Sequence, residues 1–240
     1  MYEKKKFIFI SVIFFIAFLT SVRGFGADGT EPVLGHGGMN ALMNETQWMS
    51  QSARDIKLIW WIPLQFWRVS GASTDPKPTE EQIQQLEMVL SPYLLFAAVQ
   101  GQLGPFGGIE WIPEYRLRSS LVLIDQAGRE YRPLTDNTIS LDAKNLIGFM
   151  KPMMSNMVGP MGDNLYFFFF PSLSDEKKQI VDPLMDGFFS TKFGEETHKW
   201  RMPLGSLLPP KKCPIDGEKF SGAWKYCPWH GKELVATDAR

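Results

Sequence analysis

The run Leu-Tyr-Phe-Phe-Phe-Phe at residues 165–170 constrains the fold more than any other segment of this chain. All six residues are apolar or aromatic, so the segment has no polar face that could be turned toward water. An exposed run of this kind would pair with other chains and aggregate. We therefore expect a strand over 165–170 that is covered on both faces and lies at the centre of the hydrophobic core.

The rest of the chain favours a β-rich α+β domain. Aromatic residues make up 13% of the 240 residues, which excludes wholesale disorder, and 21 Gly with 17 Pro favour many turns. Thr79-Glu80-Glu81-Gln82 has the form of a capping box and predicts a helix that ends near Pro92. A second helix is predicted over 142–158. Strands are predicted over 57–69 with an interruption at Pro63, and over 93–100, 109–112, 115–125, 130–134, 187–193 and 199–204.

One segment carries a family resemblance for this main domain. The strand pattern leading to residues 121–124 breaks at Asp125-Gln126-Ala127-Gly128 and resumes at Glu130. This strand, Asp-x-x-Gly turn, strand unit resembles hairpins of immunoglobulin-like sandwiches in secreted proteins, over about 15 residues. The resemblance implies an immunoglobulin-like β-sandwich with a few edge helices over residues 56–208.

The N-terminus has the features of a secretory signal peptide. Three consecutive lysines lie within residues 1–6, residues 7–19 form a 13-residue apolar run, and small residues precede a cleavage site after Gly24 or Gly26. An uncleaved anchor is the alternative, although a spanning helix needs about 20 apolar residues. We expect residues 1–24 to be removed, and residues 25–55 to form a flexible arm and a short helix.

Export and charge limit the partners of the mature chain. Without residues 1–24 it keeps 21 basic and 25 acidic residues, and this acidic balance argues against nucleic acid and anionic membrane surfaces. The first cysteine is Cys213, so no cysteine near the cleavage site could carry a lipid. We expect a periplasmic or extracellular protein that is not a lipoprotein and has no transmembrane span after cleavage.

The strongest motif lies in the C-terminal region 209–240, which begins as a proline-containing linker. Cys213-Pro-Ile-Asp-Gly217 and Cys227-Pro-Trp-His-Gly231 are two copies of one pattern. They resemble the knuckles of the short zinc ribbon, Cys-Pro-x-Cys-Gly, with Asp216 and His230 at the positions of the second cysteines. Both residue types can ligate zinc. The resemblance implies a structural four-coordinate site formed by Cys213, Asp216, Cys227 and His230.

Two other interpretations of these knuckles stay open. In an oxidising compartment Cys213 and Cys227 can instead form a disulfide. The knuckles can also persist as β-turns without bond or metal, since their glycines allow positive φ.

The tail also contains Trp224, Tyr226 and Trp229, which have two interpretations. They can form a binding platform for a sugar or a peptide. We favour the alternative, in which they pack the small tail onto the main domain, because a short ribbon has little other apolar material.

No catalytic constellation is recognisable. The candidate carboxylates Glu110, Glu114 and Asp125 are not paired by any spacing, and the three histidines are far apart in sequence. Soft thioethers can bind Cu(I), but a methionine cluster at helical spacing is also typical of a core-facing helix, which we favour. Its members are Met150, Met153, Met154, Met157 and Met161.

These observations predict an exported, non-enzymatic structural or interaction protein of the cell envelope or the secreted space. A metal ion or a disulfide would stabilise its C-terminal ribbon, and its partner is not identified by the sequence. The alternative is an extracytoplasmic metal-handling protein or a metal-dependent enzyme.

Overall fold

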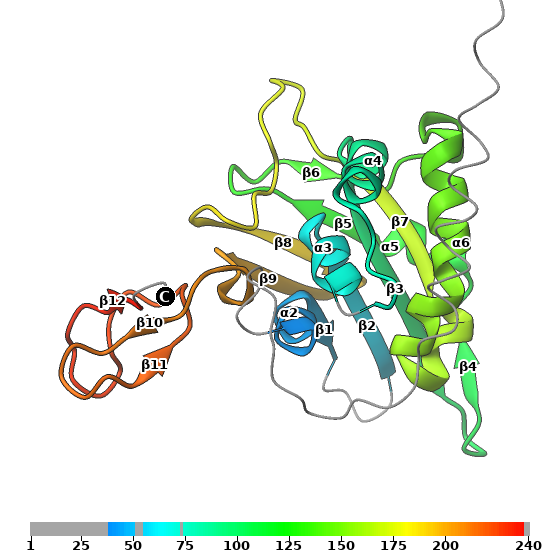
Figure 1. Cartoon of the computed structure of the whole chain (residues 1–240). Coiled ribbons are helices and arrows are strands. Elements are labelled where there is room, and N and C mark those ends of the chain that lie inside the picture. Colours follow the sequence, from blue (N-terminus) through cyan, green and yellow to red (C-terminus); the bar gives the residue numbers. More distant parts are fainter. Residues whose placement is uncertain (1–37, 51–54, 73, 238–240) are drawn as a thin grey trace, which may run out of the picture.

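The computed structural model describes residues 38–50, 55–72 and 74–237. They form a β-rich α+β domain followed by a small separate ribbon at the C-terminal end (Figure 1). The predicted signal peptide, residues 1–24, and residues 25–37 of the predicted arm lie outside the described residues. Among the helices of the described segments, none is long and apolar enough to cross a bilayer.

The first sheet of the domain is antiparallel and is built around one long strand, β3. One edge of β3 pairs with β2, and the other edge pairs first with β7 and then with β4. Phe96 of β3 lies opposite Trp61 on one side and Phe168 on the other, so these three rings share one face of the sheet. The five strands are β1 (Gln47–Met49), β2 (Asp55–Ile62), β3 (Tyr93–Leu103), β4 (Ile109–Trp111) and β7 (Tyr166–Pro171).

Strand β7 confirms the prediction made from the phenylalanine run. Phe168, Phe169 and Phe170 are all buried. Because successive side chains of a strand point to opposite faces, burial of three in a row requires cover on both sides of the sheet. The run therefore lies in the core as expected.

A second antiparallel sheet covers one face of the first. It is ordered β6-β5-β8-β9. The contact between the sheets is aromatic: the Phe189 ring centroid lies 5.0 Å from that of Trp61 and 6.0 Å from that of Phe96. The four strands are β5 (Leu121–Ile124), β6 (Glu130–Tyr131), β8 (Gly187–Phe193) and β9 (Glu196–Met202).

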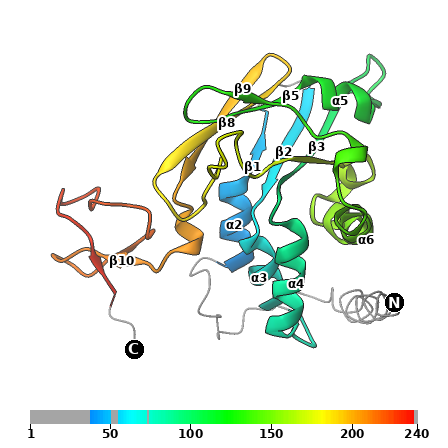
Figure 2. The same ribbon diagram turned by 90° about the horizontal axis from the view of Figure 1, so that it is seen from above.

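Helices cover the opposite face of the first sheet. Trp60 points away from the second sheet, and its ring meets Phe66 edge-on at 5.3 Å. Figure 2 shows this helical layer on one side of β2 and β3, with β5, β8 and β9 on the other. The α-helices of the domain are α2 (Gly38–Thr46), α3 (Gln65–Ala72), α4 (Glu80–Leu90), α6 (Leu141–Met157), and α5 (Glu114–Ser120), which contacts both sheets.

The domain is thus α+β with antiparallel sheets, as predicted at that level, while the immunoglobulin-like topology is not confirmed. Strands β1 to β4 and β7 lie in the first sheet, and β5, β6, β8 and β9 lie in the second. The chain therefore crosses between the sheets before β5, before β7 and before β8. A helical layer also covers a whole sheet face, whereas we expected helices only at the edges. A 15-residue hairpin resemblance specifies a local turn, and it does not determine the order of distant strands.

The prediction of strand structure over 57–69 is wrong beyond Ile62, where the chain turns into helix α3. The carbonyl of Pro63 accepts a hydrogen bond from the amide of Phe66 at 2.9 Å, and this turn begins α3. Phe66, Trp67 and Val69 are buried on the helix. Their β-prone side chains fill the helical layer, so tertiary burial prevails over local propensity.

The predicted hairpin is shorter than expected, because residues 114–120 form α5 instead of a strand. An ion pair of 2.8 Å between Glu114 and Arg118, four residues apart, lies along this helix. Residues 121–131 do form the hairpin. Asp125 is buried in its turn, where Oδ1 accepts hydrogen bonds from the amides of Ala127 and Arg129, each at 2.9 Å.

Both predicted helices are present. The capping box of α4 forms with Thr79 and Gln82 as its two partners. Helix α6 continues through Pro152 without ending. Met150 and Met154 are buried on this helix, and Met153, Met157 and Met161 pack against the same core. The methionine cluster therefore has the core role that we favoured.

The chain leaves the domain through a short 3₁₀ turn that is anchored to α2. This turn, η3 (Gly205–Leu207), directly precedes the ribbon. The carboxylate of Glu45 accepts hydrogen bonds from the amide of Gly205 at 3.0 Å, the amide of Ser206 at 2.9 Å and the hydroxyl of Ser206 at 2.6 Å. Glu45 therefore fixes the point at which the ribbon begins.

Candidate metal centre

The C-terminal ribbon is a three-stranded antiparallel sheet with two turns at one end. Its strands are ordered β11-β10-β12. An additional bridge pairs Tyr226 with Glu233. The strands are β10 (Lys211–Lys212), β11 (Lys219–Phe220) and β12 (Val235–Ala236). This pairing brings the segments that follow Lys212 and precede Val235 to the same end of the ribbon.

The first knuckle is a tight turn that the sequence encodes locally. The amide of Gly217 donates to the carbonyl of Cys213 at 2.9 Å, and the amide of Cys213 donates to the carbonyl of Glu218 at 2.8 Å. Gly217 has φ of 76°. This is left-handed backbone that glycine adopts without steric cost.

The second knuckle repeats the same hydrogen bonds fourteen positions later in the sequence. The amide of Gly231 donates to the carbonyl of Cys227 at 2.9 Å, the amide of Cys227 donates to the carbonyl of Lys232 at 2.8 Å, and Gly231 has φ of 60°. The repeated sequence pattern is therefore a repeated backbone structure.

The two knuckles bring three ligand-type side chains together. Nδ1 of His230 lies 3.4 Å from Sγ of Cys213 and 3.6 Å from Sγ of Cys227. All three ligand atoms lie within 4.8 Å of one another. In a tetrahedral zinc site, sulfur and nitrogen ligands lie about 3.6 Å apart, given zinc–sulfur and zinc–nitrogen bonds of about 2.3 and 2.0–2.1 Å. The distances around His230 fit that geometry.

Asp216 lies beside this group. Its Oδ2 is 3.6 Å from Nδ1 of His230, while its Oδ1 accepts a hydrogen bond from the amide of Glu218 at 3.0 Å. It does not belong to the group whose ligand atoms all lie within 4.8 Å. Three of the four predicted ligands therefore converge, and the fourth approaches them from the side of His230.

Burial raises the pKa of the two cysteine thiols, whereas hydrogen bonds from backbone amides lower it. Both cysteines are 1% exposed, and burial disfavours the thiolate. At Cys213 burial, together with the side chains of Asp216 and Cys227, outweighs the amides of Asp216 and Ile215, so the pKa of the thiol is raised. At Cys227 burial is outweighed by the amides of His230 and Trp229 and by the side chains of His230 and Cys213, so the pKa is lowered.

The pKa of Asp216 is also lowered. The hydrogen bond from the amide of Glu218 is the main cause, and contact with Cys213 and the nearby His230 add to it. These lowered pKa values favour the carboxylate form of Asp216 and the thiolate form of Cys227, and these are the forms that bind a metal.

The disulfide that we considered for this pair is not formed. Cys213 and Cys227 are both free. The sulfur atoms of both residues contact the same ring nitrogen of His230, so they face a common centre with the histidine.

The tail aromatics do not pack the ribbon onto the main domain, contrary to the interpretation that we favoured. Trp224, Tyr226 and Trp229 are 48%, 54% and 72% exposed. Trp224 stacks on Phe220 within the ribbon, with ring centroids 5.8 Å apart. The buried part of the ribbon is formed by Cys213, Cys227 and Leu234, with Phe220 against them.

Sequence reasoning missed two residues of this module. Leu234 packs with the cysteines in the small core, and its signal was the short apolar run Leu234-Val235-Ala236 directly after Lys232 and Glu233. Ile215 occupies the position in the first knuckle that Trp229 occupies in the second, and it is 60% exposed. Aligning the two copies of the knuckle would have identified this pair.

The other candidate residues do not form a second site. Glu114 pairs with Arg118, Asp125 lies in its hairpin turn, and Glu110 lies on β4. His198 packs between Trp48 and Trp200, at 5.5 and 4.5 Å between ring centroids. His36 lies outside the described residues.

Comparison with known proteins gives no family for this chain. No family model matches it, and neither a curated protein nor a solved structure does.

Proposed function

We propose that the C-terminal ribbon is a structural zinc module of a non-enzymatic structural or interaction protein, exported to the cell envelope or the secreted space. The observation that carries the proposal is the convergence of Cys213, Cys227 and His230 within 4.8 Å. Among the common biological metals, zinc is the one that best suits a site of two thiolates and one imidazole.

The small size of the ribbon explains why it would need a metal. Within the described part of the ribbon, the hydrophobic core consists of Cys213, Cys227 and Leu234, with Phe220 against them. A core of this size supplies little hydrophobic stabilisation, and modules of this kind usually depend on a metal or a covalent link. When bound, zinc supplies folding free energy to the module.

Asp216 is the proposed fourth ligand. Its Oδ1 is engaged by the amide of Glu218, whereas Oδ2 faces His230. A small shift of Oδ2 toward the sulfur atoms would complete four-coordination. A closed four-ligand site is structural, because no position remains for substrate or water.

The exposed aromatic residues support an interaction role. Trp229 and Ile215 project from equivalent positions of the two knuckles, at 72% and 60% exposure, and Trp224 and Tyr226 are about half exposed. So many exposed apolar and aromatic residues on so small a module support a role in contact with another protein. The partner in this proposal is another protein of the envelope or secreted space. Export itself depends on the signal peptide predicted over residues 1–24.

One observation favours the alternative, a metal-handling protein or a metal-dependent enzyme. Asp216 lies outside the group of three, and the side chains of Asp216 and His230 are 39% and 37% exposed. Three protein ligands with an accessible fourth position are the arrangement of catalytic or transfer sites.

Elemental analysis and intact mass of the purified protein test the proposal. We expect one zinc ion per chain and a mass that reductant leaves unchanged. A Cys213–Cys227 disulfide without zinc would contradict it.

Substitution of Asp216 distinguishes the structural zinc module from the metal-handling or enzymatic alternative. If Asp216 is a ligand, Asp216→Asn weakens zinc binding about tenfold or more, while the matched variant Glu218→Gln in the same turn does not. Unchanged zinc affinity in Asp216→Asn, together with binding of small thiols to the bound metal, would favour the alternative instead.

A further inference from the structure

The hairpin tip between β3 and β4 exposes three apolar side chains together. The hairpin projects beyond the neighbouring elements of the main domain (Figure 1). Phe106 at its apex is 99% exposed, and Leu103 and Ile109 on either side of it are 52% and 41% exposed. The tip sequence over 103–109 is Leu-Gly-Pro-Phe-Gly-Gly-Ile, which contains no polar or charged side chain.

The apolar surface continues from the tip along one face of the hairpin. Leu103 lies opposite Ile109 across the two strands, so both side chains project from the same face. Trp111 lies on this face, two residues beyond Ile109, and packs against the core of the domain. Gly101 leaves room for both side chains, since a Cβ atom there would lie 2.6 Å from Cγ2 of Ile109 and 2.8 Å from Cε3 of Trp111. The glycine therefore lets the apolar face extend from the tip to the sheet.

The backbone of the turn is hydrogen-bonded within itself. The amide of Gly104 donates to the carbonyl of Gly108 at 2.7 Å, and the amide of Gly107 donates to the carbonyl of Gly104 at 3.1 Å. Pro105 has no amide hydrogen. Backbone groups that enter lipid without a hydrogen-bond partner are strongly unfavourable, because the hydrocarbon offers none. The internal bonds of this turn reduce that cost.

We propose that this hairpin tip inserts into the interface of a zwitterionic lipid bilayer. Phe106 enters the acyl region, and Leu103 and Ile109 lie at its boundary. Three residue steps separate Phe106 from each of these two, a reach of at most about 10 Å, and interfacial segments bury their apolar side chains to a depth of about 5–10 Å. The exposed part of Trp111 then lies nearer the headgroups, where Trp is enriched. This contact belongs to the main domain and does not depend on metal binding by the ribbon.

The size and the charge of the tip favour a bilayer as its partner. A standard protein interface buries about 800 Å² on each partner and contains about ten hydrogen bonds. Seven residues without polar side chains do not supply such an interface, whereas a bilayer needs only apolar side chains on a bonded backbone. Gln102 and Glu110 form the next pair, exposed on the opposite face of the hairpin. The acid at Glu110 and the acidic balance of the predicted mature chain favour zwitterionic over anionic lipid.

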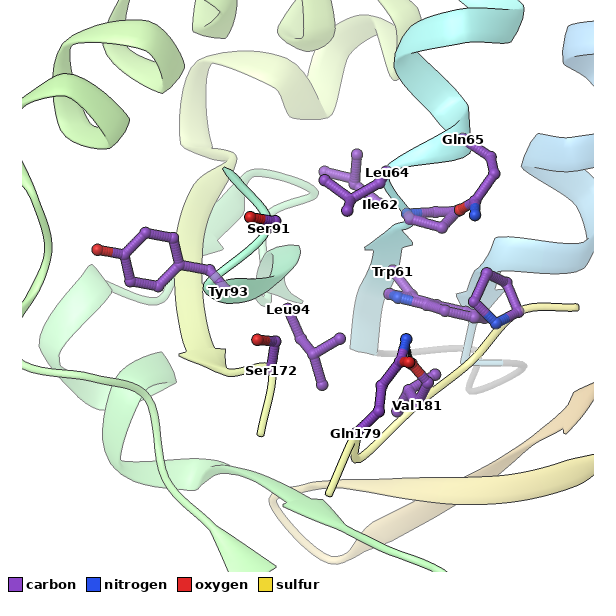
Figure 3. Close-up of a pocket in the computed structure, with 12 residues that line it drawn as sticks. Trp61, Ile62, Leu64, Gln65, Ser91, Tyr93, Leu94, Ser172, Gln179 and Val181 are labelled. Carbon is purple, nitrogen blue, oxygen red and sulfur yellow. Dashed lines mark hydrogen bonds between the residues drawn. The ribbon is translucent and has the colours of Figure 1, made fainter. Parts of the chain in front are cut away.

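The test uses the purified mature chain with phosphatidylcholine nanodiscs that carry a nitroxide on the acyl chains. Binding through one tip is expected to be weak and reversible, so the lipid is in excess. We expect the nitroxide to broaden the amide NMR signals of residues 103–109 selectively. Tyr93 and Leu94 are internal controls, because they line a pocket at the opposite end of β3, about 30 Å along the strand (Figure 3). Trp229 is a second control, since it is 72% exposed but lies in the ribbon.

A matched pair of variants tests the role of the apex ring. Phe106→Ser should weaken lipid binding about tenfold, because it removes the side chain that enters the acyl region. The fold should tolerate this change, since Phe106 is almost fully exposed. Met88→Ser, at an exposed apolar side chain on α4, should bind as the unsubstituted protein does.

Four outcomes would overturn the proposal. The first is the absence of selective broadening at the tip of the unsubstituted protein, and the second is equal lipid binding by Phe106→Ser and Met88→Ser. The third is binding that appears only when anionic lipid is added, which would assign the contact to basic residues. The fourth is a shift of the tip signals with protein concentration in the absence of lipid, which would assign the tip to a contact between two copies of the chain.

Discussion

Sγ of Cys213 lies 3.4 Å from Nδ1 of His230, although 17 positions separate the two residues. The contact joins the first residue of one knuckle to the fourth residue of the other. It depends on the pairing of β10 with both β11 and β12, which closes the ribbon. Each knuckle alone supplies two ligand-type residues, and only the closed ribbon brings ligands from both into one group.

Replacing His230 should remove the metal from the ribbon. We expect His230→Gln to lower the zinc content of the purified protein by more than half and to reduce zinc affinity at least about tenfold, because one of the converging ligands is lost. The control is His198→Gln, since His198 packs between aromatic rings of the main domain. Full zinc content in His230→Gln would place the metal elsewhere.

Alanine at Gly231 should strain the second knuckle. Its φ of 60° lies in the left-handed region, where a Cβ atom costs about 1–2 kcal/mol. If zinc binding folds the module, this cost appears as a zinc affinity about 5- to 30-fold lower, measured by competition with a chromophoric chelator. Gly108→Ala is the control, because its Cβ would meet nothing within 4 Å and its φ is not positive. Equal affinity of both variants would contradict the role given to the turn.

Asp125 should make the stability of the main domain depend on pH. Burial opposes ionisation of Asp125, but hydrogen bonds from the backbone and side chain of Arg129 and from Tyr131 outweigh it and hold the pKa below its usual value. The folded state therefore binds the proton less readily than the unfolded state, whose pKa is about 3.9. The stabilisation is present above that pH and is lost as the pH falls toward the folded pKa.

Substitution of Asp125 measures this contribution. Asp125→Asn should lower the free energy of unfolding by about 1–3 kcal/mol at pH 7, and by less at pH 3. Urea denaturation at both pH values provides the measurement. Asp163→Asn, at an exposed carboxylate, should leave stability unchanged at each pH. A constant difference between pH 7 and pH 3 for Asp125→Asn would refute the linkage.

Glu45 should hold the junction between domain and ribbon. In Glu45→Gln an amide group replaces one carboxylate oxygen, so one or more of the hydrogen bonds from Gly205 and Ser206 is lost. We expect faster hydrogen exchange at the amides of both residues and a loss of about 1–2 kcal/mol in stability. Glu195→Gln, at an exposed turn, is the control. Unchanged exchange at Gly205 and Ser206 would show that the turn holds without Glu45.

Local sequence determined the elements whose hydrogen bonds are local. The capping box of Thr79 and Gln82 predicted the start of α4, and the two Cys-Pro-x-x-Gly patterns predicted two equivalent turns. The phenylalanine run predicted a buried strand because no exposed environment suits it. The cap and the turns could be predicted because their hydrogen-bonding groups lie within about four positions of one another. The strand could be predicted because all of its side chains require a buried environment.

The tertiary structure decided those features that depend on residues far apart in the sequence. Residues 65–72 are helical because a helical layer covers the first sheet and buries Phe66, Trp67 and Val69, which their β-propensity did not indicate. The tail aromatics are exposed because the ribbon core is closed by Leu234 and Phe220 and needs no cover from the domain. The candidate metal centre combines both levels: the sequence determined the residue types and their turns, and strand pairing across the ribbon determined that Cys213, Cys227 and His230 meet.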